Sequence, residues 1–310
     1  MRIAYIEPFR RAWERMKLAL FKPFDLHKWF VVGFNAFLAG LADWHNASGS
    51  GRSRDRFDFR EFLNLPNRAW GWMTDHPGWF IAIIFLTMVV IAIGIVLLWL
   101  SSRGKFMFLD NVVHNREEIA RPWKEYRREG DALFLWRLVF GLVCFVVFIA
   151  FAVFFFVAGR QIYIAGFGRH VPVPFFIGMG LILLFMLIII GFIAMFLDSF
   201  VVPIMYKNRS AATQGWRHFL TLLGNHPLHF ILYGVLMIGL YILFVASVII
   251  IGIMTCCIGW AFLVIPYIGT VVTLPVWYTF RAFSLEFLAQ FGPDYELFPP
   301  PEPQPEASPA

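Results

Sequence analysis

One uncharged stretch near the middle of the chain decides the fold. Residues 175–197 read FFIGMGLILLFMLIIIGFIAMFL, and the first charged side chain after them is Asp198. The hydrocarbon core of a bilayer is about 30 Å thick, and a helix needs roughly 20 apolar residues to cross it. This stretch therefore predicts a transmembrane helix, and its neighbours in the sequence are interpreted from there.

Apolar stretches of similar length lie on both sides of it. They cover residues 79–100, 138–159, 230–254 and 261–280. A sixth stretch, 29–42, has only 14 residues between Lys28 and Asp43. That length fits either a short span or a segment lying in the interface. Length therefore predicts five spans, and the sixth needs a second argument.

The distribution of lysine and arginine supplies that argument, because these residues collect on the cytoplasmic side of membrane proteins. If all six stretches cross, residues 1–28, 101–137, 198–229 and the tail lie on one side and carry 19 of the 26 basic residues. Five crossings would divide them 14 to 12. We therefore predict six transmembrane helices in a bacterial inner membrane, with both termini cytoplasmic.

Composition agrees with this class and excludes others. The chain is 59% hydrophobic and 15% charged, with a mean hydropathy of +0.68. So few charged residues cannot cover a soluble globule. The three cysteines form neither a disulfide ladder nor a CxxC pair. The net charge of +6 comes from basic residues that flank apolar stretches, so we expect anionic lipid headgroups as partners and no nucleic acid.

A short aromatic pattern precedes the first, third and fifth spans. Its three positions are spaced i, i+4, i+7, as in Phe9, Trp13 and Met16, then Ile119, Trp123 and Tyr126, then Ala212, Trp216 and Phe219. A cation accompanies each copy: Arg15, Lys124 and Arg217. This spacing places the three side chains on one helical stripe. We predict three amphipathic interfacial helices at the inner membrane face, with these tryptophans and cations as anchors.

An acidic residue closes each pair of spans. Leu109-Asp110, Leu197-Asp198 and Leu285-Glu286 recur with a period of 88 residues. The all-α chain is thus predicted to form a single transmembrane domain, residues 1–290. It has three repeats of an interfacial helix and a transmembrane hairpin, at about 1–110, 111–200 and 201–290. The third repeat carries about five extra residues near 200–204.

Two regions depart from the repeat. The outer loop at 43–78 is extended, and its residues 57–73 are predicted to form a second surface helix. Residues 291–310 end in a proline-rich segment that can adopt polyproline II but cannot form a core. We predict a disordered tail.

The three periodic acids, Asp110, Asp198 and Glu286, leave two hypotheses open. A carboxylate at a helix C-terminus is disfavoured by the helix dipole, so each needs compensation. If the acids converge inside the bundle, they form an intramembrane site for a cation or protons, or pair with Arg137 and Arg281. Otherwise each acid pairs with a basic residue of a neighbouring interfacial helix and fixes the bend, or elbow, between that helix and the transmembrane span.

No motif indicates catalysis. The chain lacks HExxH, GxSxG and a Walker lysine, so we predict no enzyme, no catalytic residue, no metal and no cofactor. We expect a protein that organises lipid or a protein partner at the inner membrane face. The alternative is a small-solute or ion transporter, in which Pro266 and Pro275 break the sixth helix. A transporter requires a polar cavity that water can reach, whereas an organiser does not.

The elbow motifs also carry a resemblance. Phe-Leu-Asp at 108–110 and 196–198, with Trp-Lys-Glu-Tyr at 123–126 and Trp-Arg-His-Phe at 216–219, resembles uncharacterised bacterial six-helix membrane proteins. These include the YciC-like proteins and the membrane domain attached to some glycerophosphodiester phosphodiesterases. The resemblance covers about residues 1–295 and implies the fold. It implies no site residues, and no phosphodiesterase domain is present.

Overall fold

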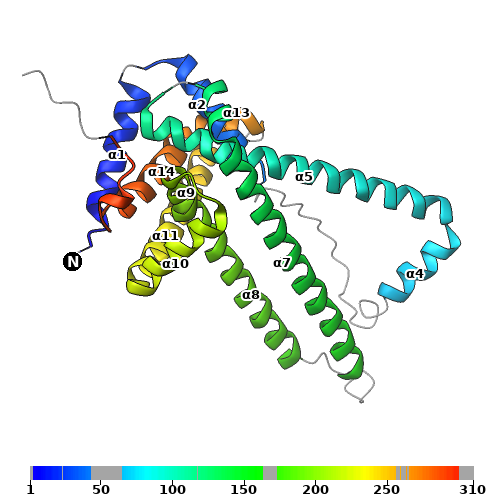
Figure 1. Cartoon of the computed structure of the whole chain (residues 1–310). Coiled ribbons are helices and arrows are strands. Elements are labelled where there is room, and N and C mark those ends of the chain that lie inside the picture. Colours follow the sequence, from blue (N-terminus) through cyan, green and yellow to red (C-terminus); the bar gives the residue numbers. More distant parts are fainter. Residues whose placement is uncertain are drawn as a thin grey trace, which may run out of the picture. The chain divides into compact units, whose positions relative to one another are not determined.

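The computed structural model is helical in every regular element that it describes (Figure 1). It describes residues 3–22, 24–42, 65–116, 118–162, 173–255 and 265–299, with Gly259 and Leu263. Most of the predicted outer loop (43–64) and the end of the predicted tail (300–310) lie outside these residues, as does part of the stretch 261–280. The predicted all-α class is confirmed for the described chain.

Within the described ranges, four long helical segments are apolar enough to cross a membrane. They are α5 (Pro77–His114), α7 (Arg127–Ile162), the continuous segment Val173–Asn208 and α11 (Pro227–Met254). The third comprises α8 (Val173–Phe196), a π-helical turn η2 (Leu197–Val201) and α9 (Val202–Asn208). Four such helices are compatible with a multi-pass membrane protein.

The other helices are shorter. They are α1 (Ile6–Phe21), α2 (Leu26–Gly40), α4 (Leu65–Asp75), α6 (Ala120–Glu125), α10 (Ala212–Asn225), α13 (Pro266–Val272), α14 (Leu274–Ala289) and the 3-10 turn η3 (Pro293–Tyr295). Asp25 caps α2 by accepting a hydrogen bond from the His27 backbone N–H at 2.8 Å, as aspartate does at helix N-termini. The helix α4 (Leu65–Asp75) overlaps the second part of the helix predicted at 57–73.

Two of the six predicted spans are not among the four long helices. With 15 residues, α2 is about 22 Å long, shorter than a typical bilayer core. The described part of the last stretch is divided at Thr273 into α13 and α14. Pro266 and Pro275 stand near the two helix starts, where a missing N–H costs nothing. Six crossings and the threefold repeat therefore remain predictions.

The chain divides into two compact units. Unit 1 comprises Met1–Leu41, Trp99–Phe134 and Met195–Ala310, and unit 2 comprises Ala42–Leu98 and Leu135–Ala194. Both α5 and α7 contribute one end to each unit. The three periodic acids and the six predicted anchors belong to unit 1, whereas Arg137, a predicted partner of the acids, belongs to unit 2.

Unit 1 contains a packed core in which α1 lies against α14 and α2 against α13 (Figure 1). Ala12, Met16 and Leu20 are the buried side of α1. Gly104 allows α5 to approach α2, because a Cβ at this position would lie 2.6 Å from the Ala39 backbone nitrogen. Large aromatic side chains such as Phe200, Phe283 and Phe287 fill the interior.

Unit 2 has the opposite character. The apolar window of α5 has no buried residue, and neither has that of α7. Phe85, Phe145 and Phe185 are examples of large side chains exposed on α5, α7 and α8. Apolar side chains exposed along whole helices fit contact with lipid rather than with water.

Candidate functional site

Each of the three periodic acids lies near the end of a helical segment in unit 1. Asp110 is in the last turns of α5, Asp198 is in the π-helical turn η2, and Glu286 is near the end of α14. Asp110 and Glu286 are buried, whereas the Asp198 side chain is about one third exposed. Each acid has its own set of partners.

Glu286 pairs with the first helix of the chain. Its carboxylate accepts a hydrogen bond from Arg15 Nε at 2.6 Å, and Arg11 lies 4.0 Å away. The Arg15 guanidinium also stacks on the ring of Phe298, 3.8 Å from its centroid. Arginine uses both its charge and its flat face in such contacts. This pair joins α1 to α14, and the segment after α14 covers it.

Asp198 is held by two basic residues from different helices. Lys105 Nζ donates to both carboxylate oxygens at 2.6 Å, and Arg281 donates to the Asp198 backbone carbonyl at 2.5 Å. That carbonyl is available because η2 has i→i+5 hydrogen bonds, as from Val202 N–H to the Leu197 carbonyl. The next donor in this register would be residue 203, which is proline and has no N–H. The π turn and Pro203 thus together present the carbonyl to Arg281.

Asp110 is surrounded by hydroxyl and imidazole groups. Its Oδ1 accepts hydrogen bonds from Tyr206 at 2.7 Å and Tyr126 at 3.3 Å, and His114 Nδ1 lies 3.1 Å away. The two tyrosine rings stack with centroids 4.7 Å apart, and Arg209 lies 4.0 Å above the centroid of the Tyr126 ring. Burial raises the pKa of Tyr126 to about 12, so its hydroxyl stays protonated and can donate.

A fourth ion pair was not predicted from the sequence. Arg103 is buried on α5, and its guanidinium makes two-pronged hydrogen bonds of 2.8–3.0 Å to Asp131 on α7. It also lies within 5.0 Å of the ring centroids of Trp99 and Trp123. The spacing of Trp99 and Arg103 by one helical turn is the signal that could have indicated this contact.

The predicted interfacial anchors fall into different environments. Trp13 is 45% exposed, Arg15 is engaged with Glu286, and Trp123 packs edge-on against Trp99 with ring centroids 5.7 Å apart. Trp216 is half-buried beside Phe219, whereas Lys124 and Arg217 are exposed. The common stripe predicted for the three aromatic patterns is not uniform in burial, because Met16, Tyr126 and Phe219 are buried and Trp13 is not.

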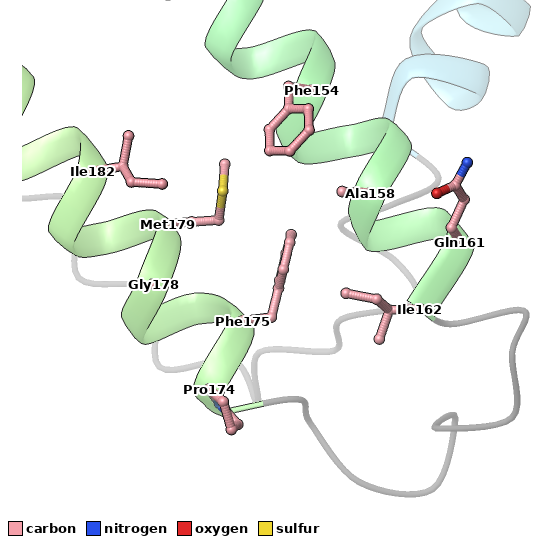
Figure 2. Close-up of a pocket in the computed structure, with 9 residues that line it drawn as sticks. All are labelled: Phe154, Ala158, Gln161, Ile162, Pro174, Phe175, Gly178, Met179 and Ile182. Carbon is pink, nitrogen blue, oxygen red and sulfur yellow. The ribbon is translucent and has the colours of Figure 1, made fainter.

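A groove in unit 2 is lined mainly by apolar side chains of the described residues. It has a volume of about 430 Å³ and lies between α7 and α8. Figure 2 shows Phe154, Phe175 and Met179 between the two helices. Among the described residues that line it, Gln161 is the one whose side chain has hydrogen-bonding groups. A groove of this composition offers dispersion contacts to an apolar occupant and little means to orient a polar solute.

Comparison with known proteins places the chain in a family. Residues 4–276 match a family described as being of unknown function, DUF7544. The chain belongs to this family. No curated protein and no solved structure matches it. Membership brings no activity to the chain, and the resemblance to the YciC-like proteins stays a prediction.

In this member of the family, Glu286 and Asp198 form ion pairs with cations of the chain, and Asp110 accepts hydrogen bonds from two tyrosines. Among the described residues, no group of three or more His, Cys, Asp or Glu side chains is placed to hold a metal ion. In the contacts given above, each periodic acid has different partner side chains, although Lys105, which binds Asp198, lies on the same helix as Asp110. Arg281 was one of the two arginines predicted as partners, and it contacts the Asp198 backbone carbonyl. Lys105 was missed, although it stands five residues before a periodic acid, as Arg281 does.

Proposed function

We propose that this protein is a non-enzymatic multi-pass membrane protein that organises anionic lipid, or a protein partner, at the membrane face carrying α1, α6 and α10. The observation that carries the proposal is a division among the cations of unit 1. Arg15, Arg103 and Lys105 bind carboxylates. Lys124, Arg128 and Arg217 are exposed and make no ion pair within the described chain. Exposed cations beside membrane helices attract anionic headgroups.

The acids support the same function. An intramembrane ion site needs carboxylates that a ligand can reach. Glu286 and Asp198 instead bind cations of the chain itself, and Asp110 accepts from two tyrosines. Such pairs stabilise the contacts between helices and leave the outward cations to meet other molecules.

We infer six crossings, and the ion pairs support them by an argument of parity. Arg15 near the start of the chain contacts Glu286, and Lys105 at the end of α5 contacts Asp198, which Arg281 also contacts. These residues therefore lie at one membrane face. Because α5 crosses the membrane to reach that face, the chain between α1 and α5 must cross as well, and α2 is its described apolar helix.

The same argument applies to the end of the chain. From Asn208, at this face, α11 crosses to the other side, and Arg281 is again at the starting face. We therefore infer a return crossing between α11 and Arg281. With six crossings, 19 of the 26 basic residues share this face, which favours a cytoplasmic location for it and for both termini in a bacterial inner membrane.

Two contacts support the threefold repeat. Lys105 and Arg281 occupy matching positions five residues before Asp110 and Glu286. Both donate to Asp198, the acid of the middle repeat. Matching residues from the first and third repeats thus bind the second one.

The test is the composition of the lipid around the full-length protein. The protein is reconstituted in nanodiscs of equimolar phosphatidylcholine and phosphatidylglycerol, and the lipids that remain bound are counted by native mass spectrometry. We expect an excess of phosphatidylglycerol. In parallel, cross-linking in cells reports a protein partner at the cytoplasmic face. Bound lipid identical to the bulk mixture, together with no cross-linked partner, would overturn the proposal.

Two buried asparagines favour the alternative of a transporter. Asn35 on α2 and Asn111 on α5 are almost fully buried, and their amide atoms have no hydrogen-bond partner within the described chain. Buried amides without partners are rare and often indicate water. Together with the break at Thr273, they would suit a wet path between helices.

Thiol labelling separates the two functions. Asn35→Cys and Asn111→Cys are introduced one at a time into a chain whose three native cysteines are replaced by alanine. Native membranes that contain each variant are then treated with a membrane-impermeant maleimide. Labelling of both positions would support a water-filled path and the transporter. No labelling, with an exposed Lys124→Cys control that reacts in opened vesicles, would support the dry interior of an organiser.

A further inference from the structure

The last turn of α1 carries a mixed patch of cations and apolar side chains. Lys17, Leu18, Phe21 and Lys22 are all exposed, and Leu18 is exposed by 58%. Residues four apart are neighbours on a helix surface, so Lys17 lies next to Phe21, and Lys22 follows directly as the C-cap of the helix. Ala19 and Leu20, between them in sequence, are buried. We call these four exposed residues the α1 patch.

Aromatic contacts extend this patch around the turn into α2. Trp29 donates its indole N–H to the Leu20 carbonyl at 2.8 Å and meets Phe21 edge-on, with ring centroids 5.4 Å apart. Phe24 packs against the same indole at 5.6 Å, yet it remains 57% exposed. The protein therefore holds Phe21 and Phe24 in defined positions while leaving much of both rings uncovered.

The two lysines differ from the arginines earlier on α1. Arg10 and Arg11 pair with Glu7, and Arg15 pairs with Glu286. Lys17 and Lys22 make no ion pair within the described chain. Within the described residues, no carboxylate is paired with either lysine, so their charge is available to an anion.

We propose that the α1 patch, together with Phe24, binds an anionic phospholipid. Lys17 and Lys22 contact its phosphate, and the three apolar side chains, Leu18, Phe21 and Phe24, lie against its upper acyl chains. This inference rests on the proposed function and names the ligand and its place. Charge complementarity selects an anion. The apolar side chains beside the lysines favour a lipid over free phosphate, since burying exposed aromatic rings at the headgroup boundary lowers the free energy. The adjacent α2 enters the bilayer in the six-crossing arrangement.

The experiment compares two double variants of the full-length protein in the nanodiscs described above. Lys17→Gln/Lys22→Gln removes the cations of the α1 patch. Arg10→Gln/Arg121→Gln is the matched control, because it removes the same net charge from exposed positions on α1 and α6 where each cation already pairs with a glutamate. Native mass spectrometry counts bound phosphatidylglycerol, and the melting temperature of each variant shows that the fold is retained.

We expect the patch variant to lose most of the excess phosphatidylglycerol and the control to keep most of it. A third variant, Phe21→Gln/Phe24→Gln, retains the charge, and its loss of bound lipid would support a lipid over a free phosphate. Unchanged binding by this third variant would overturn the part assigned to the rings.

Three further results have defined meanings. Equal losses in the patch variant and the control would overturn the inference, because net charge alone would explain the binding. Full binding by the patch variant would also overturn it while leaving the proposed function intact. If the unaltered protein shows no excess of phosphatidylglycerol, the lipid form of the proposed function fails, and the inference fails with it.

Discussion

The two ends of α5 differ in which side chains are buried. Along residues 79–96, apolar side chains such as Phe85 are exposed, and the apolar window of the helix has no buried residue. Along residues 101–113, every side chain is buried, including Arg103, Lys105 and Asp110. The same helix thus exposes its apolar half and buries its charged half. A helix in lipid gains little from burying apolar surface, whereas buried charges require specific partners.

The charged end of α7 is likewise the better packed one. Glu129 and Leu133 are buried in unit 1, and Val139, Leu142 and Phe148 are exposed in unit 2. We infer that the stability of the protein depends mainly on unit 1, and that the exposed helices tolerate apolar substitutions. The predictions below test this contrast.

The largest effect is expected for Asp198→Asn. This change leaves Lys105, which is 3% exposed, without the carboxylate that it contacts at 2.6 Å. Removing one partner of a fully buried pair costs about 3–5 kcal/mol of stability. Because the Asp198 side chain is 34% exposed, we expect a loss at the lower end of this range, about 3 kcal/mol. Chemical denaturation in detergent measures the loss. The double variant Asp198→Asn/Lys105→Met should recover part of it, and a double variant no more stable than Asp198→Asn would contradict this account.

A smaller loss is expected for Gly104→Ala, with Gly94→Ala on the same helix as its control. At Gly104 a Cβ would meet the α2 backbone at 2.6 Å, whereas at Gly94 nothing lies within 4 Å. Overpacking costs about 1–3 kcal/mol, and an alanine in an open helical position stabilises by roughly 0.5–1 kcal/mol. The two melting temperatures should therefore shift in opposite directions. Shifts of the same sign would contradict the conclusion that close packing against α2 requires glycine at position 104.

Alkaline pH should weaken unit 1 through Tyr126. Unfolded tyrosine ionises near pH 10, whereas burial raises the pKa of Tyr126 to about 12. The unfolded chain therefore loses its proton first, and the stability that Tyr126 contributes is complete below about pH 10 and lost as the pH rises towards about 12. Melting curves across this range should fall less steeply for Tyr126→Phe. Identical slopes would show that Tyr126 is not involved.

The smallest effect is expected in unit 2. Phe148 is 50% exposed on α7, so Phe148→Leu should change stability by less than about 0.5 kcal/mol. The same substitution at Phe283, which is fully buried in unit 1, is the comparison and should be clearly destabilising. Comparable losses at the two positions would mean that α7 has a packing partner in the membrane.

The sequence by itself determined the helical membrane class, the positions of the long apolar helices and the periodic acids near helix ends. These features depend on residues that are close together in the chain, as in the uncharged stretch at 175–197. The break at Thr273 was expected only as a possibility raised by Pro266 and Pro275, because a proline permits either a kink or a new helix start.

Only the tertiary structure decided which partner each acid has. Arg15 and Glu286 are 271 residues apart, and Lys105 and Asp198 are 93 apart. Lys105 and Arg103 looked like ordinary flanking cations, and their burial depends on helices that are distant in sequence. A hydrophobic run is a local property that predicts a helix in lipid, whereas a buried charge is stable only where folding brings its counter-charge within reach.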